Sequence, residues 1–183
     1  MCGIAGEFRF DGTAPDAAAM ARMLAKLERR GPDAEGQHAD GPVRLGHRRL
    51  SIIDLSSRSH QPMVDAATGT TLVFNGTIYN YPELRAELIE CGQVFHSDGD
   101  TEVILRAWLE WGDACVERLH GMFAFAIWNR ETLFLARDRL GIKPLYYSEN
   151  PGCFRFASTP QALLAAGGVD TGLDAVALHH LFT

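Results

Sequence analysis

The second residue of the chain is a cysteine, and its place beside the initiator methionine makes it the first candidate for chemistry. Aminopeptidases remove an initiator methionine when the next side chain is small, so we expect Cys2 to become the N-terminus. It would then combine a thiol nucleophile with a free α-amino group, whose reference pKa of about 7.7–8.0 lets it accept the thiol proton. Gly3 and Gly6 would allow a tight turn and close approach of a substrate. The alternative is a buried, inert cysteine.

A second candidate is the pair Asn75-Gly76, which follows a strand pattern at residues 71–74. The Asn75 side-chain amide and the Gly76 backbone N–H could form an oxyanion hole, which stabilises the charge of a tetrahedral intermediate. The alternative is a plain turn, because Asn-Gly is among the commonest turn pairs.

Two charged side chains could hold an amino acid by its charged end. Arg49 could bind a carboxylate through two parallel hydrogen bonds, and Asp100 could bind an ammonium group. The alternatives are a solvated surface charge for Arg49 and a helix cap for Asp100. His47, His179 and His180 are interpreted as ordinary polar residues, since no metal-ligand spacing surrounds them.

The composition is that of a globular protein whose 183 residues fit one domain with a sizeable core. A net charge of −6 argues against a nucleic-acid-binding surface. The four cysteines are widely spaced, with no C-x-x-C pair, which favours reduced cytosolic thiols over a zinc site or disulfides. No apolar run approaches about eighteen residues, so we expect a cytoplasmic protein without a membrane segment.

The elements that must position these residues are short strands and amphipathic helices. Hairpin-type connections and two groups of helices favour an α+β fold with a largely antiparallel core. Neither G-x-G-x-x-G nor a P-loop is present. Strands are predicted at 3–10, 34–39, 43–47, 50–55, 71–74, 122–128, 132–136, 145–147 and 154–157, and helices at 16–30, 81–91, 100–111, 161–166 and from 174 onward.

Taken together, the ordered motifs resemble one family across nearly the whole chain. They are Met-Cys-Gly-Ile at the start, Arg-Gly-Pro-Asp at 30–33, the segment 47–54, Gln-Pro-Met at 61–63, Phe-Asn-Gly at 74–76 through Tyr-Asn at 79–80, Asp-Thr-Glu-Val-Ile-Leu at 100–105, His-Gly-Met-Phe-Ala-Phe-Ala at 120–126 and the run 136–147. The chain is similar to the class II glutamine amidotransferase domain of the asparagine synthetase family.

This resemblance implies the N-terminal nucleophile hydrolase fold, a four-layer αββα sandwich of two antiparallel sheets between helices. Residues 1–183 would form a glutaminase domain that releases ammonia from L-glutamine through a thioester. The implied roles are Cys2 as nucleophile with its own amine as base, Asn75 and Gly76 as oxyanion hole, Arg49 at the glutamine carboxylate, and Gly99 and Asp100 at its ammonium.

The resemblance also implies partners beyond this chain. In the family, ammonia passes to a C-terminal synthetase domain that uses ATP and Mg, and that domain is expected after residue 183. No cofactor is expected within residues 1–183, and neither nucleic acid nor membrane is an expected partner. A homodimer stays open.

The chain departs from the family pattern at Thr77, where glutamate is usual, and at Thr159, where glutamate is also usual. The tail at 165–171 and 178–180 is similar to the N-acetylglutaminylglutamine amidotransferases, which build the amide of an acetylated glutamine dipeptide. Two rival readings stay open. One is a degenerate domain that regulates a synthetase without turnover, which Thr77 favours. The other is an N-terminal-cysteine hydrolase for another amide, against which Arg49 and Asp100 speak.

Overall fold

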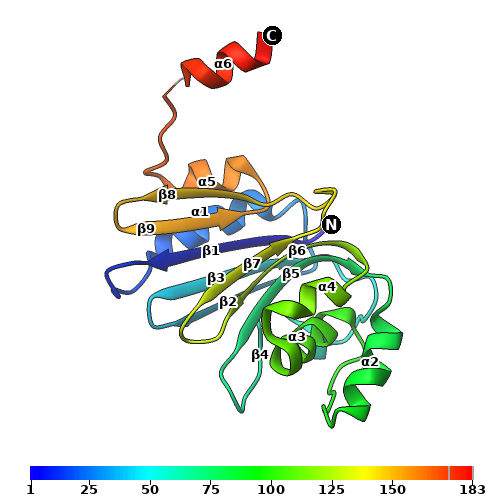
Figure 1. Ribbon diagram of the computed structural model, residues 1–183. Coiled ribbons are helices and arrows are strands. Elements are labelled where there is room, and N and C mark those ends of the chain that lie inside the picture. The colour runs from blue at the N-terminus through cyan, green and yellow to red at the C-terminus, as the bar shows by residue number, and fades with distance from the viewer. Residues whose placement is uncertain (173, 183) are drawn as a thin grey trace.

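Two antiparallel sheets stack against each other between layers of helices (Figure 1). The structure, a computed structural model, describes residues 1–172 and 174–182. The strand order in the first sheet is β2 (Ala34–Asp40), β3 (Val43–Arg49), β1 (Gly3–Arg9), β9 (Cys153–Ala157) and β8 (Tyr146–Asn150). The order in the second sheet is β4 (Met63–Val64), β5 (Thr71–Ile78), β6 (Gly121–Trp128) and β7 (Leu133–Arg137).

The helices cover the outer faces of both sheets. On the first sheet pack α1 (Ala17–Leu27) and α5 (Pro160–Ala166), and on the second α2 (Tyr81–Glu90), α3 (Asp100–Trp111) and α4 (Cys115–Arg118). The remaining elements are the 3-10 turns η1 (Ser57–Ser59) and η2 (Gly112–Ala114) and the helix α6 (Ala175–Phe182), which lies apart from the layers (Figure 1). The predicted αββα sandwich is therefore confirmed. Within the described ranges, no helix is long and apolar enough to cross a membrane.

The helix α1 begins where its sequence predicts. The Asp16 carboxylate accepts hydrogen bonds from the backbone N–H groups of Ala18 at 2.8 Å and Ala19 at 3.1 Å, which satisfies two donors that a helix start leaves free. Met20 and Leu24 are buried and pack on the first sheet. This packing fixes the sheet whose central strand begins directly after Cys2.

Side chains of β5 alternate between two cores, as strand geometry requires. Phe74 packs with the helices that cover the second sheet, whereas Val73 packs between the two sheets with Ile4. Asn75 and Thr77 have the same parity as Val73, so their side chains lie on the side that faces the first sheet. The strand thereby directs the polar residues of the family motif toward the N-terminus of the chain.

Two predictions about these segments are wrong. Residues 50–55 form a loop instead of a strand, in which Ile52 is 69% and Leu55 is 76% exposed, because polar contacts rather than apolar packing hold this segment. The pair Asn75-Gly76 lies inside β5, where Gly76 pairs with Phe123 of β6, and not at a strand end. The plain-turn alternative for this pair is thereby excluded.

Candidate active site

All seven predicted site residues line one cavity of about 170 Å³ at the edge of the sandwich. The fold brings them together from four separate segments, which are the N-terminus, the end of β3, the middle of β5 and the start of α3. Gln61 and Lys143, which belong to quoted motifs but have no predicted role in the site, line the same cavity. The seven predicted residues are Cys2, Arg49, Asn75, Gly76, Thr77, Gly99 and Asp100.

Backbone contacts hold the Cys2 thiol in the lining of this cavity. Its Sγ accepts a hydrogen bond from the Leu50 N–H at 3.3 Å and lies 3.6 Å from the Leu50 carbonyl oxygen, to which it can donate. Arg30 Nε donates to the Cys2 carbonyl oxygen at 3.0 Å. Burial raises the pKa of the Cys2 thiol, while the Leu50 hydrogen bond, the N-terminal charge and Arg49 lower it less strongly. The thiol therefore needs a base to become a nucleophile.

The edge of β5 that faces away from β6 supplies a row of backbone donors. In an antiparallel pair, alternate residues point their N–H groups to opposite sides of the strand. On this edge, Phe74 N–H donates to Gln61 Oε1 at 2.6 Å and Ile78 N–H donates to Asp100 Oδ2 at 3.0 Å. Gly76 lies between them with the same parity and lines the cavity. The geometry of β5 therefore directs the Gly76 N–H toward the cavity, on the same edge as the N–H groups of Phe74 and Ile78.

The side-chain amide of Asn75 adds a second donor. Asn75 is 1% exposed, and its Nδ2 has no hydrogen-bond partner among the described residues. A buried donor without an acceptor costs about 1–3 kcal/mol, so a folded protein rarely leaves one unless a ligand uses it. Asn75 Nδ2 and Gly76 N–H therefore form a pair of donors suited to an oxyanion.

Gly76 is required by space as well as by its N–H. A Cβ at this position would lie 2.3 Å from the Met122 carbonyl oxygen and 2.6 Å from the Phe74 ring. Both neighbours belong to packed strands that cannot move without disturbing the sheet. The close approach of β5 and β6 at the site therefore depends on this glycine.

Asp100 supplies a buried anion in the lining of the cavity. It is the first residue of α3, whose N-cap is Gly99, and it is 5% exposed. Burial raises the pKa of its carboxyl group to about 6, against the opposing effect of the Ile78 hydrogen bond. Because its hydrogen bond runs to β5, Asp100 links helix and strand and does more than cap a helix. A bound cation would favour its charged form.

Arg49 is buried, so the alternative of a solvated surface charge is wrong. It is 6% exposed, its Nη1 donates to the Ser56 carbonyl oxygen at 2.9 Å, and its Nη2 donates to the Asp54 carbonyl oxygen. The guanidinium has five N–H donors, so three stay available for a carboxylate. Asp54, the other carboxylate of the cavity, already accepts hydrogen bonds from Ser56 N–H, Ser59 Oγ and Asp98 N–H.

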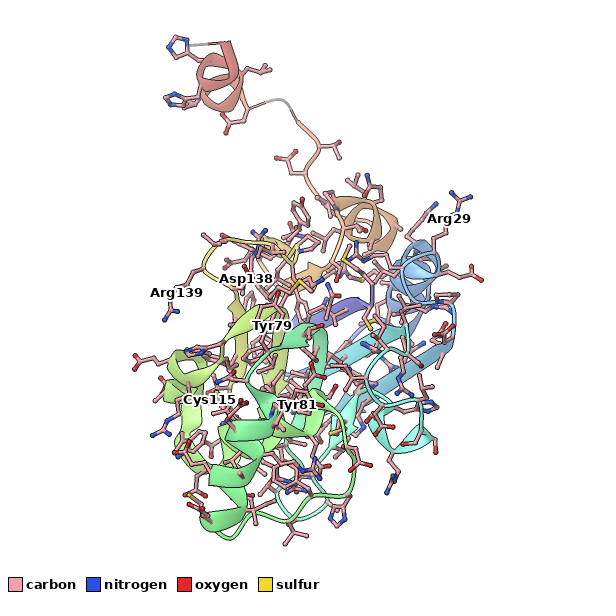
Figure 2. The ribbon with its side chains drawn as sticks, turned by 90° about the vertical axis from the view of Figure 1, so that its right-hand side faces the viewer. Arg29, Tyr79, Tyr81, Cys115, Asp138 and Arg139 are labelled. Atoms are coloured by element: carbon pink, nitrogen blue, oxygen red, sulfur yellow. The ribbon has the colours of Figure 1, made fainter. Side chains whose placement is uncertain are left out.

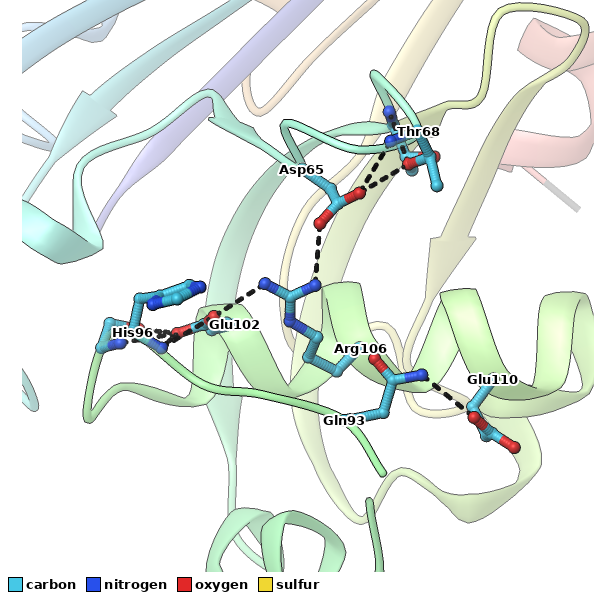
Figure 3. A network of polar contacts seen from close by, with 9 residues as sticks. Asp65, Thr68, Gln93, His96, Glu102, Arg106 and Glu110 are labelled. Atoms are coloured by element: carbon cyan, nitrogen blue, oxygen red, sulfur yellow. Dashed lines mark hydrogen bonds and ion pairs between the residues drawn. The ribbon is translucent and has the colours of Figure 1, made fainter. Parts of the chain in front are cut away.

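A network of buried charges fixes the segment that carries Gly99 (Figure 3). The Glu102 carboxylate accepts the backbone N–H groups of His96 at 2.9 Å and Ser97 at 2.6 Å. Arg106 bridges Glu102 at 3.2 Å and Asp65 at 2.7 Å. The i, i+4 spacing of Glu102 and Arg106 could have indicated their pair from the sequence. The role of Asp65 could not, because it lies on a distant hairpin.

His47 joins the two sheets and is not a ligand candidate. It is 1% exposed, and its Nε2 lies 3.2 Å from the Phe74 carbonyl oxygen. Burial lowers the pKa of the imidazole to about 3, so His47 is neutral near pH 7. In the part of the chain that the structure describes, no group of three His, Cys, Asp or Glu residues could hold a metal ion.

Comparisons with known proteins agree with this geometry. A family model described as "Glutamine amidotransferase domain" matches residues 1–183. Asparagine synthetase [glutamine-hydrolyzing] 3 of Bacillus subtilis is 38% identical over 187 aligned residues, which cover 100% of this chain and 30% of that protein. Asparagine synthetase [glutamine-hydrolyzing] 1 of the same organism is 40% identical and covers 97% of this chain and 29% of its own length. The chain thus spans less than a third of these relatives.

The fold also matches solved structures. Glutamine phosphoribosylpyrophosphate amidotransferase from B. subtilis superposes with a TM-score of 0.78 over 92% of this chain and 44% of that chain. At 20% sequence identity, this likeness concerns the fold. It confirms the N-terminal nucleophile type of αββα sandwich.

The charge network of Figure 3 yields a stability prediction. Arg106→Met would leave two buried carboxylates, on Asp65 and Glu102, without their cation, and we expect it to lower the free energy of unfolding by about 3–5 kcal/mol. The matched control is Arg58→Met, whose ion pair with Asp98 is exposed and should contribute about 1 kcal/mol or less. Denaturant unfolding of both variants measures the difference. Equal losses would contradict the role assigned to Arg106.

Proposed function

Since this chain belongs to the class II glutamine amidotransferase domains of the asparagine synthetase family, we propose that it hydrolyses L-glutamine to glutamate and ammonia on Cys2. The observation that carries the proposal is the arrangement of one cavity. It places the Cys2 thiol, the unpartnered amide of Asn75 and the buried charges of Arg49 and Asp100 around the same space. The thiol and the Asn75 amide suit the side-chain amide of an amino acid such as glutamine, and the two charges suit its α-carboxylate and α-ammonium.

The reaction follows from these groups once Met1 is removed. The α-amine of Cys2 takes the thiol proton, and the thiolate attacks the side-chain amide carbon of glutamine to form a C–S bond. Asn75 and Gly76 donate to the oxyanion of the tetrahedral intermediate. As the intermediate collapses, the C–N bond breaks, and the amine returns its proton to the leaving nitrogen, which departs as ammonia. Water then hydrolyses the thioester to glutamate and restores the thiol.

The two ends of glutamine's zwitterion have separate partners in this proposal. Arg49 binds the α-carboxylate through its free N–H donors, and Asp100 binds the α-ammonium. Thr77 lines the cavity and offers a hydroxyl group but no charge. Because Asp54 already accepts hydrogen bonds from its own loop and from Asp98, Asp100 is the main anionic partner of the ammonium in this proposal. Gly99, which has no side chain, lets the backbone lie close to the α-ammonium.

The proposal extends to the fate of the ammonia. The relatives are more than three times longer than this chain, which supports a synthetase domain joined to residues 1–183 and using ATP and Mg. Ammonia would there be transferred to an acceptor in an amide-forming ligase reaction. The similarity of the segments 165–171 and 178–180 supports an acetylated glutaminylglutamine dipeptide as that acceptor.

A second candidate function rests on Thr77. A domain that has lost turnover would bind glutamine and regulate a synthetase without releasing ammonia, and the missing glutamate favours this alternative. The intact set of Cys2, Asn75 and Asp100 supports the enzyme instead. Ammonia release by the wild-type protein distinguishes the two.

The proposed base requires processing of the N-terminus. We expect active protein to lack one methionine by intact mass, because a preceding residue turns the amine into a non-basic amide. We expect Cys2→Ala to abolish ammonia release while keeping the fold by circular dichroism. The matched control is Cys91→Ala, which changes an exposed thiol outside the cavity. Full activity in protein that retains Met1, or in Cys2→Ala, would contradict the mechanism.

The oxyanion hole makes a kinetic prediction. Loss of one such donor costs about 2.7–4 kcal/mol of transition-state stabilisation, so we expect Asn75→Ala to lower kcat by about two to three orders of magnitude. KM should change less, because the oxyanion exists only after attack. Steady-state ammonia release measures both constants. An effect confined to KM would show that Asn75 binds ground-state substrate.

The raised pKa of Asp100 predicts pH-dependent binding of glutamine. Below about pH 6 the empty site holds a neutral carboxyl group, so its attraction for the ammonium is lost as the pH falls. In the Cys2→Ala background, where no turnover occurs, we expect the Kd for glutamine to rise about tenfold between about pH 7.5 and about pH 5. Calorimetry at both pH values measures this change. Asp100→Asn should bind weakly at both, and a flat profile in the parent would contradict the role of Asp100.

A further inference from the structure

Lys143 is a buried cation in the active-site cavity that the proposed reaction does not use. It is 5% exposed and lies in the loop between β7 and β8. Its Nζ lies 3.3 Å from the Sδ of Met1, a thioether that accepts hydrogen bonds weakly. Among the residues that the structure describes, no carboxylate forms an ion pair with it. A buried ammonium with so poor a partner calls for a functional explanation.

The loop holds Lys143 by its backbone. The Asp138 carboxylate accepts the N–H of Lys143 at 3.0 Å and of Phe123 at 3.1 Å, which ties the loop to β6. Arg137 donates to the carbonyl oxygens of Lys143 at 2.7 Å and Gly141 at 2.6 Å. The Lys143 backbone is therefore fixed on both sides, independently of the charge on its side chain. The side chain can be changed without removing these contacts.

Removal of Met1 would take away the one polar contact that the Lys143 ammonium makes within the described part of the chain. Met1 Sδ is five covalent bonds from the Cys2 nitrogen, so Lys143 Nζ lies within about 10 Å of that nitrogen. We propose that Lys143 keeps the freed α-amino group of Cys2 in its neutral, proton-accepting form. A positive charge in the same buried cavity disfavours a second positive charge on the amine and favours the thiolate. This inference rests on the proposed glutaminase reaction.

Other charged groups face the same amine. Arg30, between α1 and β2, donates to the Cys2 carbonyl oxygen. Arg49 of β3 donates to the Ser56 carbonyl oxygen. Because these hydrogen bonds hold both guanidinium groups in place, each adds positive charge from a fixed position. Asp100 of α3 and Asp54 of the loop after β3 are negative and act in the opposite direction. Lys143 differs from the two arginines because, among the described residues, its ammonium has a polar contact only with Met1, the residue that is removed.

The test is the pH dependence of kcat/KM for glutamine in Lys143→Met, which removes the charge and keeps the length of the side chain. Two unit charges about 10 Å apart shift each other's titration by about 0.3–1 pH unit at effective dielectric constants between those of water and a protein surface. We expect the acidic limb of the kcat/KM profile of Lys143→Met to move to higher pH by this amount. Lys143→Arg should restore it. Arg139→Met removes an exposed charge of the same loop, which points away from the molecule (Figure 2), and should leave it unmoved.

A second readout separates this inference from the proposed function. Alkylation of Cys2 by iodoacetamide, followed on the N-terminal peptide by mass spectrometry, reports the thiolate without glutamine turnover. We expect its pH profile to shift upward in Lys143→Met as well. Unshifted profiles in active protein, or a rise in KM alone, would overturn the inference and leave the glutaminase intact. A wild type that releases no ammonia would overturn the proposed function, while the alkylation profile would still decide the role of Lys143.

Discussion

Every backbone N–H on the open edge of β5 needs an acceptor, and the site is built around how this need is met. β4 pairs with β5 at Leu72 and Thr71, and in the described residues the rest of this edge has no strand partner. Gln61 accepts from Phe74, and Asp100 accepts from Ile78. The position between them, at Gly76, faces the cavity. An oxyanion bound there would accept a hydrogen bond from the Gly76 N–H, as Gln61 and Asp100 do from the N–H groups on either side.

The same edge also connects the elements that hold the substrate. Asp100 is at once the acceptor for β5, the first residue of α3 and the buried anion of the cavity. The charges of Glu102, Arg106 and Asp65 keep the preceding segment in place, so Asp100 needs little reorganisation when an ammonium binds. Burial raises the pKa of Asp100, and a ligand of opposite charge would reverse this effect. Fold stability and ligand binding thus depend on one set of buried charges.

Much of this site could be predicted from the sequence, because its motifs carry both local structure and chemistry. The order of the motifs is sufficient to predict the αββα layers and seven of the residues that line the cavity. The apolar residues of the segment 50–55 predict a strand, but the segment is a loop that Arg49 and Asp54 hold by polar contacts. The position of Asn75-Gly76 inside β5 does not follow from the sequence, because this pair is so common in turns.

Long-range contacts account for what the sequence did not show. Lys143 enters the cavity from a loop far along the chain, and nothing in its neighbourhood indicates that it meets Met1. The hydrogen bond from the Phe123 N–H to Asp138 depends on the register of the β6–β7 hairpin, which places Ala124 opposite Arg137. The unpartnered amide of Asn75 is visible only once every possible acceptor has been placed.

The central claim is that the Cys2 thiol attacks a glutamine-like carbonyl whose oxygen lies between Asn75 and Gly76. A crystal structure of the processed protein, inactivated by an electrophilic glutamine analogue, tests this claim most directly. We expect a covalent bond to Cys2 Sγ and a former carbonyl oxygen about 2.7–3.1 Å from both Asn75 Nδ2 and Gly76 N. An adduct on another residue, or an oxygen directed away from these two donors, would contradict it.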